Sequence, residues 1–206
     1  MQRGTLITIE GVDGAGKSTL AVSLQRELSA RGARVQLLRE PGGVELSERI
    51  RALVQDPALD VLPRTEALLY AAARAQLVHE RLLPALAGGA LVLLDRFVDS
   101  SLAYQGAARG LGVEQVRAVN ELATGGLRPD RTLLLRIDPA AARARQAARG
   151  LQADRLEREH PRFFAAVAAA YDELAQAEPE RIRAIDALQA PARVLADALA
   201  AVEDLL

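Results

Sequence analysis

The glycine-rich segment from Gly11 to Thr19 has the residue types and spacing of a phosphate-binding loop. Its sequence matches the pattern G-x-x-x-x-G-K-[ST] and reads Gly11-Val12-Asp13-Gly14-Ala15-Gly16-Lys17-Ser18-Thr19. Glycines permit positive φ and close approach, so backbone N–H groups and the start of the next helix can surround phosphates. Lys17 is expected to reach the β- and γ-phosphates, and the Ser18 hydroxyl to bind Mg²⁺. The pattern predicts a nucleotide site, and a glycine-rich turn without nucleotide is the structural alternative.

Lys17 is the only lysine among 26 basic residues. A compositional bias explains most of the arginine excess, but a compact ammonium does what a planar guanidinium cannot. A guanine-reading N-K-x-D signature would need a second lysine. The loop alone does not separate a kinase from a GTP-dependent switch or a motor, and the missing lysine excludes the guanine-reading switch.

Asp95 and Arg96 follow a buried apolar run, Leu91 to Leu94. A carboxylate at the end of a strand is placed to hold Mg²⁺ directly or through water. An adjacent arginine suits a second phosphate, because phosphoryl transfer needs charge neutralised on both donor and acceptor. The structural alternatives are a helix cap for Asp95 and a surface ion pair for Arg96.

Five short apolar runs alternate with longer segments of helical periodicity. The predicted strands are 6–9, 35–38, 91–94, 133–135 with Ile137, and 182–185, and the clearest predicted helices are 18–30, 64–86, 114–123 and 140–149. Such alternation indicates an α/β fold in which helices cover both faces of a five-stranded parallel sheet. At 206 residues we expect one domain over 1–206, with ligands beyond the carboxyl ends of the strands.

The composition excludes several classes of protein. The formal net charge of −1 gives no global attraction to a nucleic acid polymer, and the chain has no cysteine for disulfides or thiolate metal sites. No apolar run is long enough for a membrane span or a signal peptide. We therefore expect a cytoplasmic protein without a membrane partner.

A lid is predicted within about 143–156, where arginines surround Gly150. These are Arg143, Arg145, Arg149 and Arg155. Closing the segment over the site would add a cation to the transferring phosphoryl group, an arginine finger supplied in cis. We favour Arg149 and Arg155 as the catalytic residues, because Arg143 and Arg145 also fit a solvated basic helix.

Four motifs, occurring in the family's order, closely resemble those of bacterial thymidylate kinases over nearly the whole chain. They are Gly11 to Thr19, Arg39 to Gly43 (REPGG), Asp95 to Gln105 (DRFVDSSLAYQ) and Arg149-Gly150 to Asp154-Arg155. The resemblance implies ATP-dependent phosphorylation of dTMP to dTDP for dTTP synthesis, with Mg²⁺ and a homodimeric assembly. Lys17, Arg96, Arg149 and Arg155 would be catalytic.

The resemblance also implies an acceptor site. Asp13 would face the sugar, Arg96 and Arg51 would bind the phosphate, and Glu40-Pro41 would form a tight turn, cis or trans, beside it. Tyr70 and Arg74, at i, i+4 spacing, would stack on thymine and donate to its carbonyl. Ser100 would serve the base and Tyr104 would exclude a 2′-hydroxyl, while Gln105 fits a position near the base or a helix surface. Without the resemblance, Tyr70 would be read as core and Arg74 as a solvated charge.

Three positions depart from the family pattern. Val44 follows Gly43 where threonine is frequent, Arg136 takes a strand position that is often acidic, and three residues separate Gly150 from Asp154 instead of two. The last departure shifts the register of the lid arginines. The segment 185–190 resembles the adenine-side loop. The alternatives are another pyrimidine nucleotide or deoxynucleoside kinase and a non-catalytic ATP-binding module.

Overall fold

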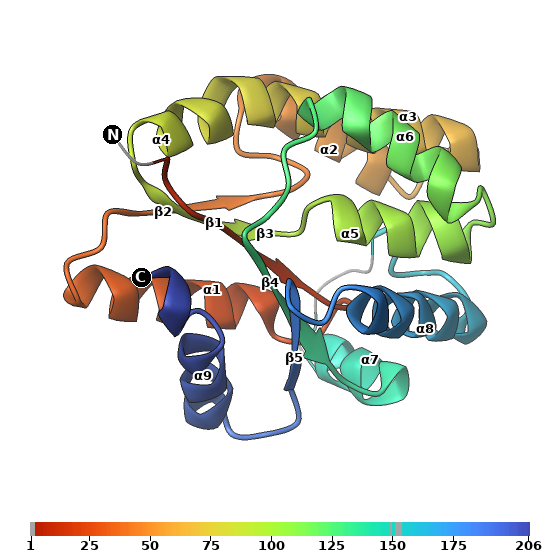
Figure 1. The fold of residues 1–206 in the computed structure, drawn as a ribbon. Coiled ribbons are helices and arrows are strands. Elements are labelled where there is room, and N and C mark those ends of the chain that lie inside the picture. Colours follow the sequence, from red (N-terminus) through yellow and green to blue (C-terminus); the bar gives the residue numbers. More distant parts are fainter. Residues whose placement is uncertain (1–2, 149, 151–153) are drawn as a thin grey trace.

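The computed structural model, which describes residues 3–148, 150 and 154–206, contains one five-stranded sheet. The strands are β1 (Leu6–Glu10), β2 (Val35–Arg39), β3 (Leu91–Asp95), β4 (Arg131–Arg136) and β5 (Ile182–Asp186). They run parallel in the order β2-β3-β1-β4-β5 (Figure 1). The predicted α/β fold is confirmed. The fourth strand was predicted to include Ile137, but it ends at Arg136 and extends back to Arg131 instead.

The centre of the sheet is buried on both faces, as its continuous apolar runs predict. Every residue of β1 is buried, and Ile7 pairs with Leu93 on one side while Ile9 pairs with Leu133 on the other. The strands β2 and β5 lie at the edges and are partly exposed. The order changes direction at β1, so the loop after β1 lies at the switch point where ligands bind in such sheets.

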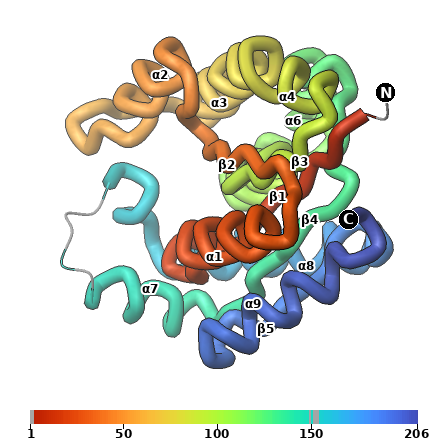
Figure 2. Tube along the Cα trace, turned by 90° about the vertical axis from the view of Figure 1, so that its left-hand side faces the viewer, coloured from red at the N-terminus to blue at the C-terminus, as the bar shows by residue number. Residues whose placement is uncertain are grey.

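Helices cover both faces of the sheet. They are α1 (Lys17–Ala30), α2 (Glu45–Gln55), α3 (Pro63–Leu77), α4 (Leu83–Ala87), α5 (Val98–Ser101), α6 (Val113–Thr124), α7 (Pro139–Ala147), α8 (Pro161–Ala177), α9 (Pro191–Ala200) and the short 3₁₀ helix η3 (Glu203–Leu205). Figures 1 and 2 show α1 and α9 together on one side, with α2, α3, α4 and α6 forming a layer on the other. Leu24 and Leu28 of α1 are fully buried in the same cluster as Ile7 and Ile9.

Two helical segments contain wide π turns. The segment predicted as one helix over 64–86 consists of α3, the π-helical η1 (Val78–Leu82) and α4. Pro84 lies just after η1 and has no N–H to donate, which is a physical reason for an irregular turn there. The second π-helical segment, η2 (Leu102–Ala108), follows α5 directly and carries Tyr104 and Gln105. No helix among the described residues is long and apolar enough to cross a membrane.

Candidate active site

The loop between β1 and α1 requires its glycines. Gly11, Gly14 and Gly16 have φ values of 135°, 85° and 102°, in the region that side chains rarely adopt. A Cβ atom on Gly14 would lie 2.2 Å from the carbonyl oxygen of Ala142 in α7, and one on Gly11 would lie 2.6 Å from that of Leu135. The loop therefore packs against β4 and α7 with backbone alone, and its amides and the N-terminus of α1 form an anion-binding site.

Lys17 is buried at the start of α1. Its Nζ donates a 3.0 Å hydrogen bond to the carbonyl oxygen of Val12 and lies 3.7 Å from Asp13 Oδ1. Burial and the nearby Arg96 lower the pKa of Lys17 to about 8, although Asp13 and other carboxylates oppose the shift. The ammonium group is held inside the curve of the loop, where a phosphate chain would replace part of its lost hydration.

Ser18 and Asp95 present two oxygens beside the phosphate-binding loop. The Ser18 Oγ donates a 2.8 Å hydrogen bond to Asp95 Oδ2. No group of three or more acidic, histidine or cysteine side chains in the described part of the chain could hold a metal by itself. One hydroxyl and one carboxylate nevertheless suit Mg²⁺, which takes few protein ligands and completes its octahedron with waters and phosphates.

Arg96 joins the phosphate-binding loop to the next cavity. Its backbone has φ 71°, rare for a non-glycine residue, and its Nη2 donates to Asp13 Oδ1 at 2.5 Å. Nη1 donates to Ser100 Oγ at 3.0 Å, and the guanidinium lies 5.1 Å from the centroid of the Tyr104 ring. Burial alone would raise the pKa of Asp13, but Arg96 and Lys17 hold it well below its usual range. Asp13 is therefore a permanent anion between two cations.

Glu10 lies beneath Arg96, and the sequence analysis missed it. This fully buried carboxylate accepts hydrogen bonds from Phe97 N at 2.7 Å, Ser100 Oγ at 2.6 Å and Tyr171 Oη at 2.9 Å. Burial and the charge of Asp99 raise the pKa of Glu10. The only signal in the sequence is a charged residue in an otherwise apolar strand just before Gly11. Glu10 fixes the backbone after Arg96 and the hydroxyl to which Arg96 donates.

A cavity of about 160 Å³, here called the acceptor cavity, lies on the β3 side of the phosphate-binding loop. All ten predicted substrate-binding residues line it: Asp13, Glu40, Pro41, Arg51, Tyr70, Arg74, Arg96, Ser100, Tyr104 and Gln105. The sequence analysis missed other lining residues, which are Gln55, Ser101, Asp154, Leu156 and Glu157. These residues come from distant segments and meet because helices α2 and α3 and segment η2 converge beyond β2 and β3.

Glu40 and Arg74 form a buried pair in the wall of the acceptor cavity. Arg74 is 1% exposed and donates to Glu40 Oε2 at 2.7 Å, to Ser101 Oγ and the Phe97 carbonyl at 2.9 Å each, and to Asn120. Burial raises the pKa of Glu40 to about 7 against the opposing effect of Arg74, and Glu40 Oε1 has no hydrogen-bond partner within the described residues. Arg74 is thus strongly engaged by protein, and its hydrogen bond to a base carbonyl stays a prediction.

The turn after β2 was predicted to be tight and either cis or trans, and it is the cis form. The Glu40–Pro41 peptide bond is cis, and Arg51 Nη1 donates to the Pro41 carbonyl at 3.0 Å. Arg51 therefore lies at the mouth of the acceptor cavity with part of its guanidinium held in place.

Arg155 is anchored away from the phosphate-binding loop. It donates to the carbonyl oxygen of Val54 at 2.9 Å and to the buried carboxylate of Glu66 at 2.5 Å. Arg149, the other predicted catalytic arginine of the lid, lies outside the described residues. Arg143 stacks on Phe164 at 5.8 Å, and Arg145 Nη1 donates to the Ala187 carbonyl at 2.9 Å. Arg143 and Arg145 therefore each contact another part of the protein, in addition to any contact with solvent.

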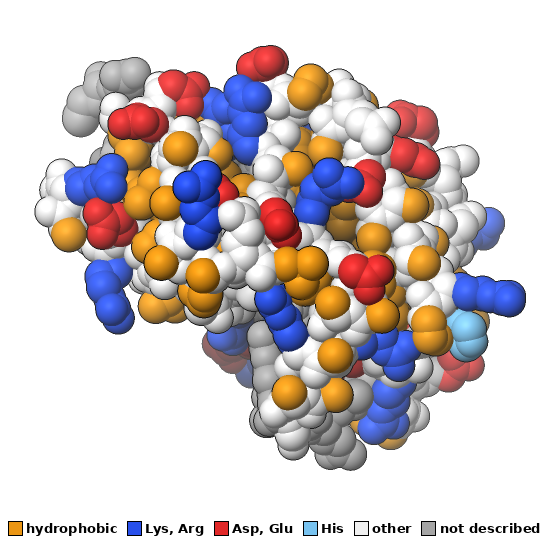
Figure 3. Space-filling view, turned by 90° about the horizontal axis from the view of Figure 1, so that it is seen from below, with side chains coloured by type: hydrophobic (Ala, Val, Ile, Leu, Met, Phe, Trp, Pro, Cys, Tyr) orange, Lys and Arg blue, Asp and Glu red, His pale blue; other side chains and the backbone are white. Residues whose placement is uncertain are grey.

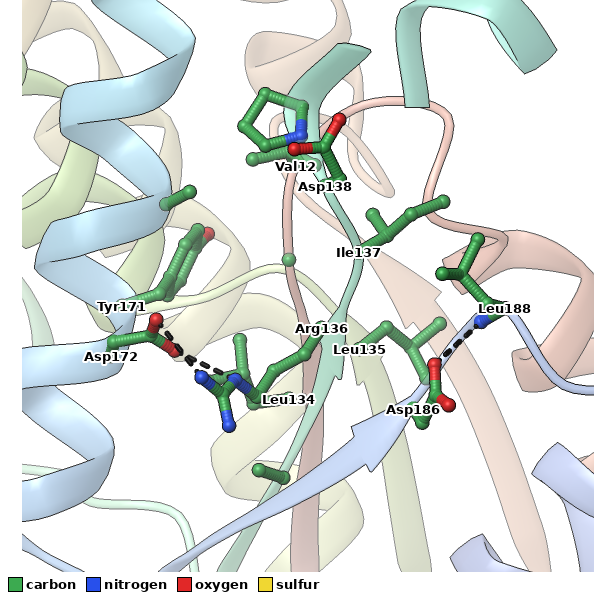
Figure 4. A pocket seen from close by; sticks show the side chains of 14 residues that line it. Val12, Leu134, Leu135, Arg136, Ile137, Asp138, Tyr171, Asp172, Asp186 and Leu188 are labelled. Atoms are coloured by element: carbon green, nitrogen blue, oxygen red, sulfur yellow. Dashed lines mark hydrogen bonds and ion pairs between the residues drawn. The ribbon is translucent and has the colours of Figure 1, made fainter. Parts of the chain in front are cut away.

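Two further cavities lie on the β4 side of the phosphate-binding loop. A cavity of about 330 Å³, here called the donor cavity, is lined by residues of the loop together with Arg145, Ala187 and Gln189, and the last two belong to the predicted adenine-side segment. A second, open cavity of about 580 Å³ lies between β4, β5 and α8 (Figure 4). There Arg136 forms a 2.8 Å ion pair with Asp172 of α8, which accounts for a basic residue at the end of β4.

The rest of the surface carries both signs of charge. On the face seen in Figure 3, basic and acidic side chains are interspersed among hydrophobic ones. This distribution matches a formal net charge of −1.

Comparison with known proteins places these features in one family. The family model described as thymidylate kinase matches residues 9–198. A thymidylate kinase of Deinococcus radiodurans is 47% identical, with 99% of this chain and 98% of that protein covered, and one of Caldanaerobacter subterraneus subsp. tengcongensis is 46% identical, with 99% and 97% covered. The crystal structure of thymidylate kinase from Ehrlichia chaffeensis is similar with a TM-score of 0.81 and 26% identity, over 98% of this chain and 99% of that one. The chain belongs to the thymidylate kinase family.

Proposed function

We propose that this protein transfers the γ-phosphoryl group of ATP to dTMP and so forms dTDP and ADP, a step that supplies dTTP synthesis. The observation that carries the proposal is the contact between Asp13 and Arg96, at 2.5 Å. Asp13 belongs to the phosphate-binding loop and Arg96 to the wall of the acceptor cavity. The contact brings a donor site and an acceptor site edge to edge, as direct transfer between two bound nucleotides requires.

The donor is held by the phosphate-binding loop. Backbone amides of the segment Gly11 to Thr19 and the Lys17 ammonium surround the β- and γ-phosphates, while the adenine lies toward the donor cavity near Arg145 and Gln189. Ser18 and Asp95 would hold Mg²⁺ directly or through water, and the bound cation would supply positive charge that offsets the charge developing during transfer.

The acceptor occupies the cavity between Tyr70 and Tyr104. Arg96 and Arg51 bind the monophosphate, Tyr70 stacks on the base, and Arg74, Ser100 and Gln105 supply polar contacts around it. Tyr104 lies beside the sugar with its hydroxyl fixed by Asp13 Oδ2 at 3.1 Å. An oxygen of the dTMP phosphate attacks the γ phosphorus while the bond to the bridging oxygen of ADP breaks. That oxygen is already anionic, so the rate comes from positioning and charge stabilisation.

The lid arginines supply the remaining positive charge. Arg149 is the first candidate, because Arg155 has partners on α2 and α3. Arg155 could reach the phosphoryl group only by giving up its bonds to Glu66 and Val54. The extra residue between Gly150 and Asp154 is consistent with a change in which arginine acts.

The assembly is proposed to be a homodimer in the cytoplasm. Several leucines on neighbouring helices are exposed to solvent in one chain: Leu46 and Leu53 on α2, Leu68 on α3 and Leu122 on α6. Leu122 is 89% exposed, which is costly for so large an apolar side chain. A second copy packed on this helical layer would bury these leucines.

The test is ADP release with ATP and Mg²⁺ in the presence of dTMP, dUMP, dCMP, AMP or thymidine. We expect a strong preference for dTMP and a loss of about 10²- to 10³-fold in kcat/KM for Arg96→Ala, the range for removing one charge-stabilising donor. Arg49→Ala removes an exposed arginine of α2 whose ion pair within the described part of the chain is with Glu45, and it should have little effect. Equal turnover with thymidine or AMP would refute the proposed acceptor, and no turnover with any acceptor would favour a non-catalytic ATP-binding module.

A further inference from the structure

Glu66 is a fully buried carboxylate behind the wall of the acceptor cavity, where it contacts the lining residue Gln105. It lies on α3, one helical turn before Tyr70, and is 0% exposed. Its Oε1 accepts from Gln105 Nε2 at 2.9 Å and from Arg109 Nε at 3.2 Å. Its Oε2 accepts from Arg109 Nη2 at 3.1 Å and from Arg155 Nη2 at 2.5 Å. Both oxygens are therefore fully used, by residues from two separate segments: the η2 segment with its C-cap Arg109, and the stretch around Arg155.

The surroundings of Glu66 prevent this carboxylate from turning. Arg109 is itself held by Glu159 at 2.6 Å and stacks on the ring of Phe163 at 4.7 Å. Arg155 is held by the Val54 carbonyl. The guanidinium groups of Arg109 and Arg155 are held in place, so they hold the Glu66 carboxylate in place. The carboxylate in turn orients the side chain of Gln105.

Glu66 determines which end of the Gln105 amide faces the cavity. A carboxylate paired with arginines only accepts hydrogen bonds, so Gln105 must turn its NH₂ group toward Glu66. Gln105 is 2% exposed and lines the acceptor cavity. No hydrogen bond to Gln105 Oε1 is present among the residues that the structure describes. The carbonyl oxygen is left as an acceptor for a ligand, and the amide cannot flip without placing its oxygen against the carboxylate.

A hydrogen-bond acceptor at the position of Gln105 Oε1 distinguishes the pyrimidine bases. Thymine and uracil carry an N–H donor at N3, whereas cytosine carries a lone pair there. We propose that Glu66 is a positioning residue that selects keto pyrimidines over cytosine, because it locks the Gln105 carbonyl toward the base. This inference rests on the proposed function, since it concerns the base of the acceptor nucleotide.

The experiment compares kcat/KM for dTMP, dUMP and dCMP in wild type and Glu66→Gln. The new amide can both donate and accept, so Gln105 becomes free to flip and present its NH₂ group to cytosine. We expect the dTMP-to-dCMP ratio to fall roughly tenfold or more, because a site built around one hydrogen bond rejects a base that cannot make it. The dTMP-to-dUMP ratio should stay unchanged, since both bases present N3–H. A merely structural defect would lower all three values together.

Matched variants separate positioning from folding. Gln105→Leu should also lower the dTMP-to-dCMP ratio, and adding Glu66→Gln to it should lower the ratio no further. Arg109→Met leaves the bond between Glu66 and Gln105 in place, so it should lower the melting temperature but keep the ratio. If Glu66→Gln alone does not fold, the pair Glu66→Gln with Arg109→Met restores the charge balance and takes its place.

The outcomes distinguish the two proposals. A wild-type enzyme that uses dTMP, with an unchanged dTMP-to-dCMP ratio in the Glu66→Gln proteins, would overturn the role of Glu66 and leave the proposed function intact. A wild-type protein that does not phosphorylate dTMP would overturn both.

Discussion

The Ser18 hydroxyl and the Asp95 carboxylate meet at 2.8 Å across the carboxyl edge of the sheet. The register of β1 and β3 brings them together, because Ile9 pairs with Asp95 and α1 begins just after the loop that follows β1. Ser18 is exposed at the surface of this site. A metal ion bound to donor phosphates can therefore reach both oxygens from solvent.

Asp95→Asn should raise the Mg²⁺ concentration needed for half-maximal velocity by about tenfold. The amide keeps an oxygen ligand of similar shape but loses the charge that Mg²⁺ favours. The measurement is initial velocity against Mg²⁺ at fixed ATP and dTMP. Asp186→Asn, at the end of β5, is the matched control. An unchanged Mg²⁺ dependence would remove Asp95 from the metal site.

ATP affinity should weaken as pH rises above about 8. The pKa of Lys17 is lowered to about 8, chiefly by burial, so the free protein loses the ammonium charge above that pH. Bound phosphates favour the charged form, and each further pH unit then costs up to about tenfold in affinity by proton linkage. Calorimetric titration of ATP between pH 7 and pH 9.5 measures the effect. Lys17→Arg stays charged throughout and should give a flat, weaker profile; a wild-type profile equally flat would contradict the argument.

The free energy of unfolding should fall as pH rises from about 4.5 to about 7, because of the raised pKa of Glu40. Its pKa is raised by burial from 4.5 to about 7, so in that window the native state holds a proton that the unfolded chain releases. The stabilising contribution is complete below pH 4.5 and is lost as pH passes 7, a change on the order of 3 kcal/mol. Urea unfolding of wild type and Glu40→Gln across this range gives the difference. The difference should depend on pH; a constant value would show that Glu40 is ionised in the native state throughout.

Tyr104→Phe should reduce discrimination against a ribonucleotide acceptor. The ring stays between Arg96 and Phe163, but the hydroxyl held by Asp13 is removed and leaves room beside the sugar. We expect the ratio of kcat/KM for dTMP to that for 5-methyluridine monophosphate to fall by up to about tenfold, because excluding one hydroxyl supplies about 1–3 kcal/mol. Tyr70→Phe, which retains the ring proposed to stack on the base, should leave this ratio unaltered. If the kcat/KM ratio of the two nucleotides is unchanged in Tyr104→Phe, another residue must select the sugar.

The sheet and the phosphate-binding loop could be predicted because their signals are local. Apolar runs mark β1 and β3, and the spacing of glycines with Lys17 favours a phosphate-binding loop over a glycine-rich turn without nucleotide. Arg96 was predicted from its place directly after a strand, the other nine acceptor-site residues came from the family resemblance, and the structure brings all ten to one cavity. Their chemistry with substrate is still a prediction.

Buried polar residues were the part that sequence could not reveal. Glu66 lies in a helical sequence pattern in which a charged residue is usually solvated. Its position inside the protein depends on pairing with Arg109 and Arg155, which lie 43 and 89 residues away. Glu10 depends in the same way on Tyr171. Such pairs are set by packing between distant elements, so a single segment shows at most a charged residue in an apolar pattern and does not show its partner. The same reason explains why Arg155 could be assigned to the lid but not to its anchor on α3.

The strand order β2-β3-β1-β4-β5 places the acceptor cavity and the donor cavity on either side of the central strand. The acceptor cavity is built from α2, α3 and η2, whereas the donor cavity is built from α7, α9 and the segment after β5. Among the residues that the structure describes, only those of the phosphate-binding loop contribute to both. Mutations on one side can therefore accumulate without disturbing the other, so the choice of acceptor and the choice of donor are free to evolve as independent traits within one small domain.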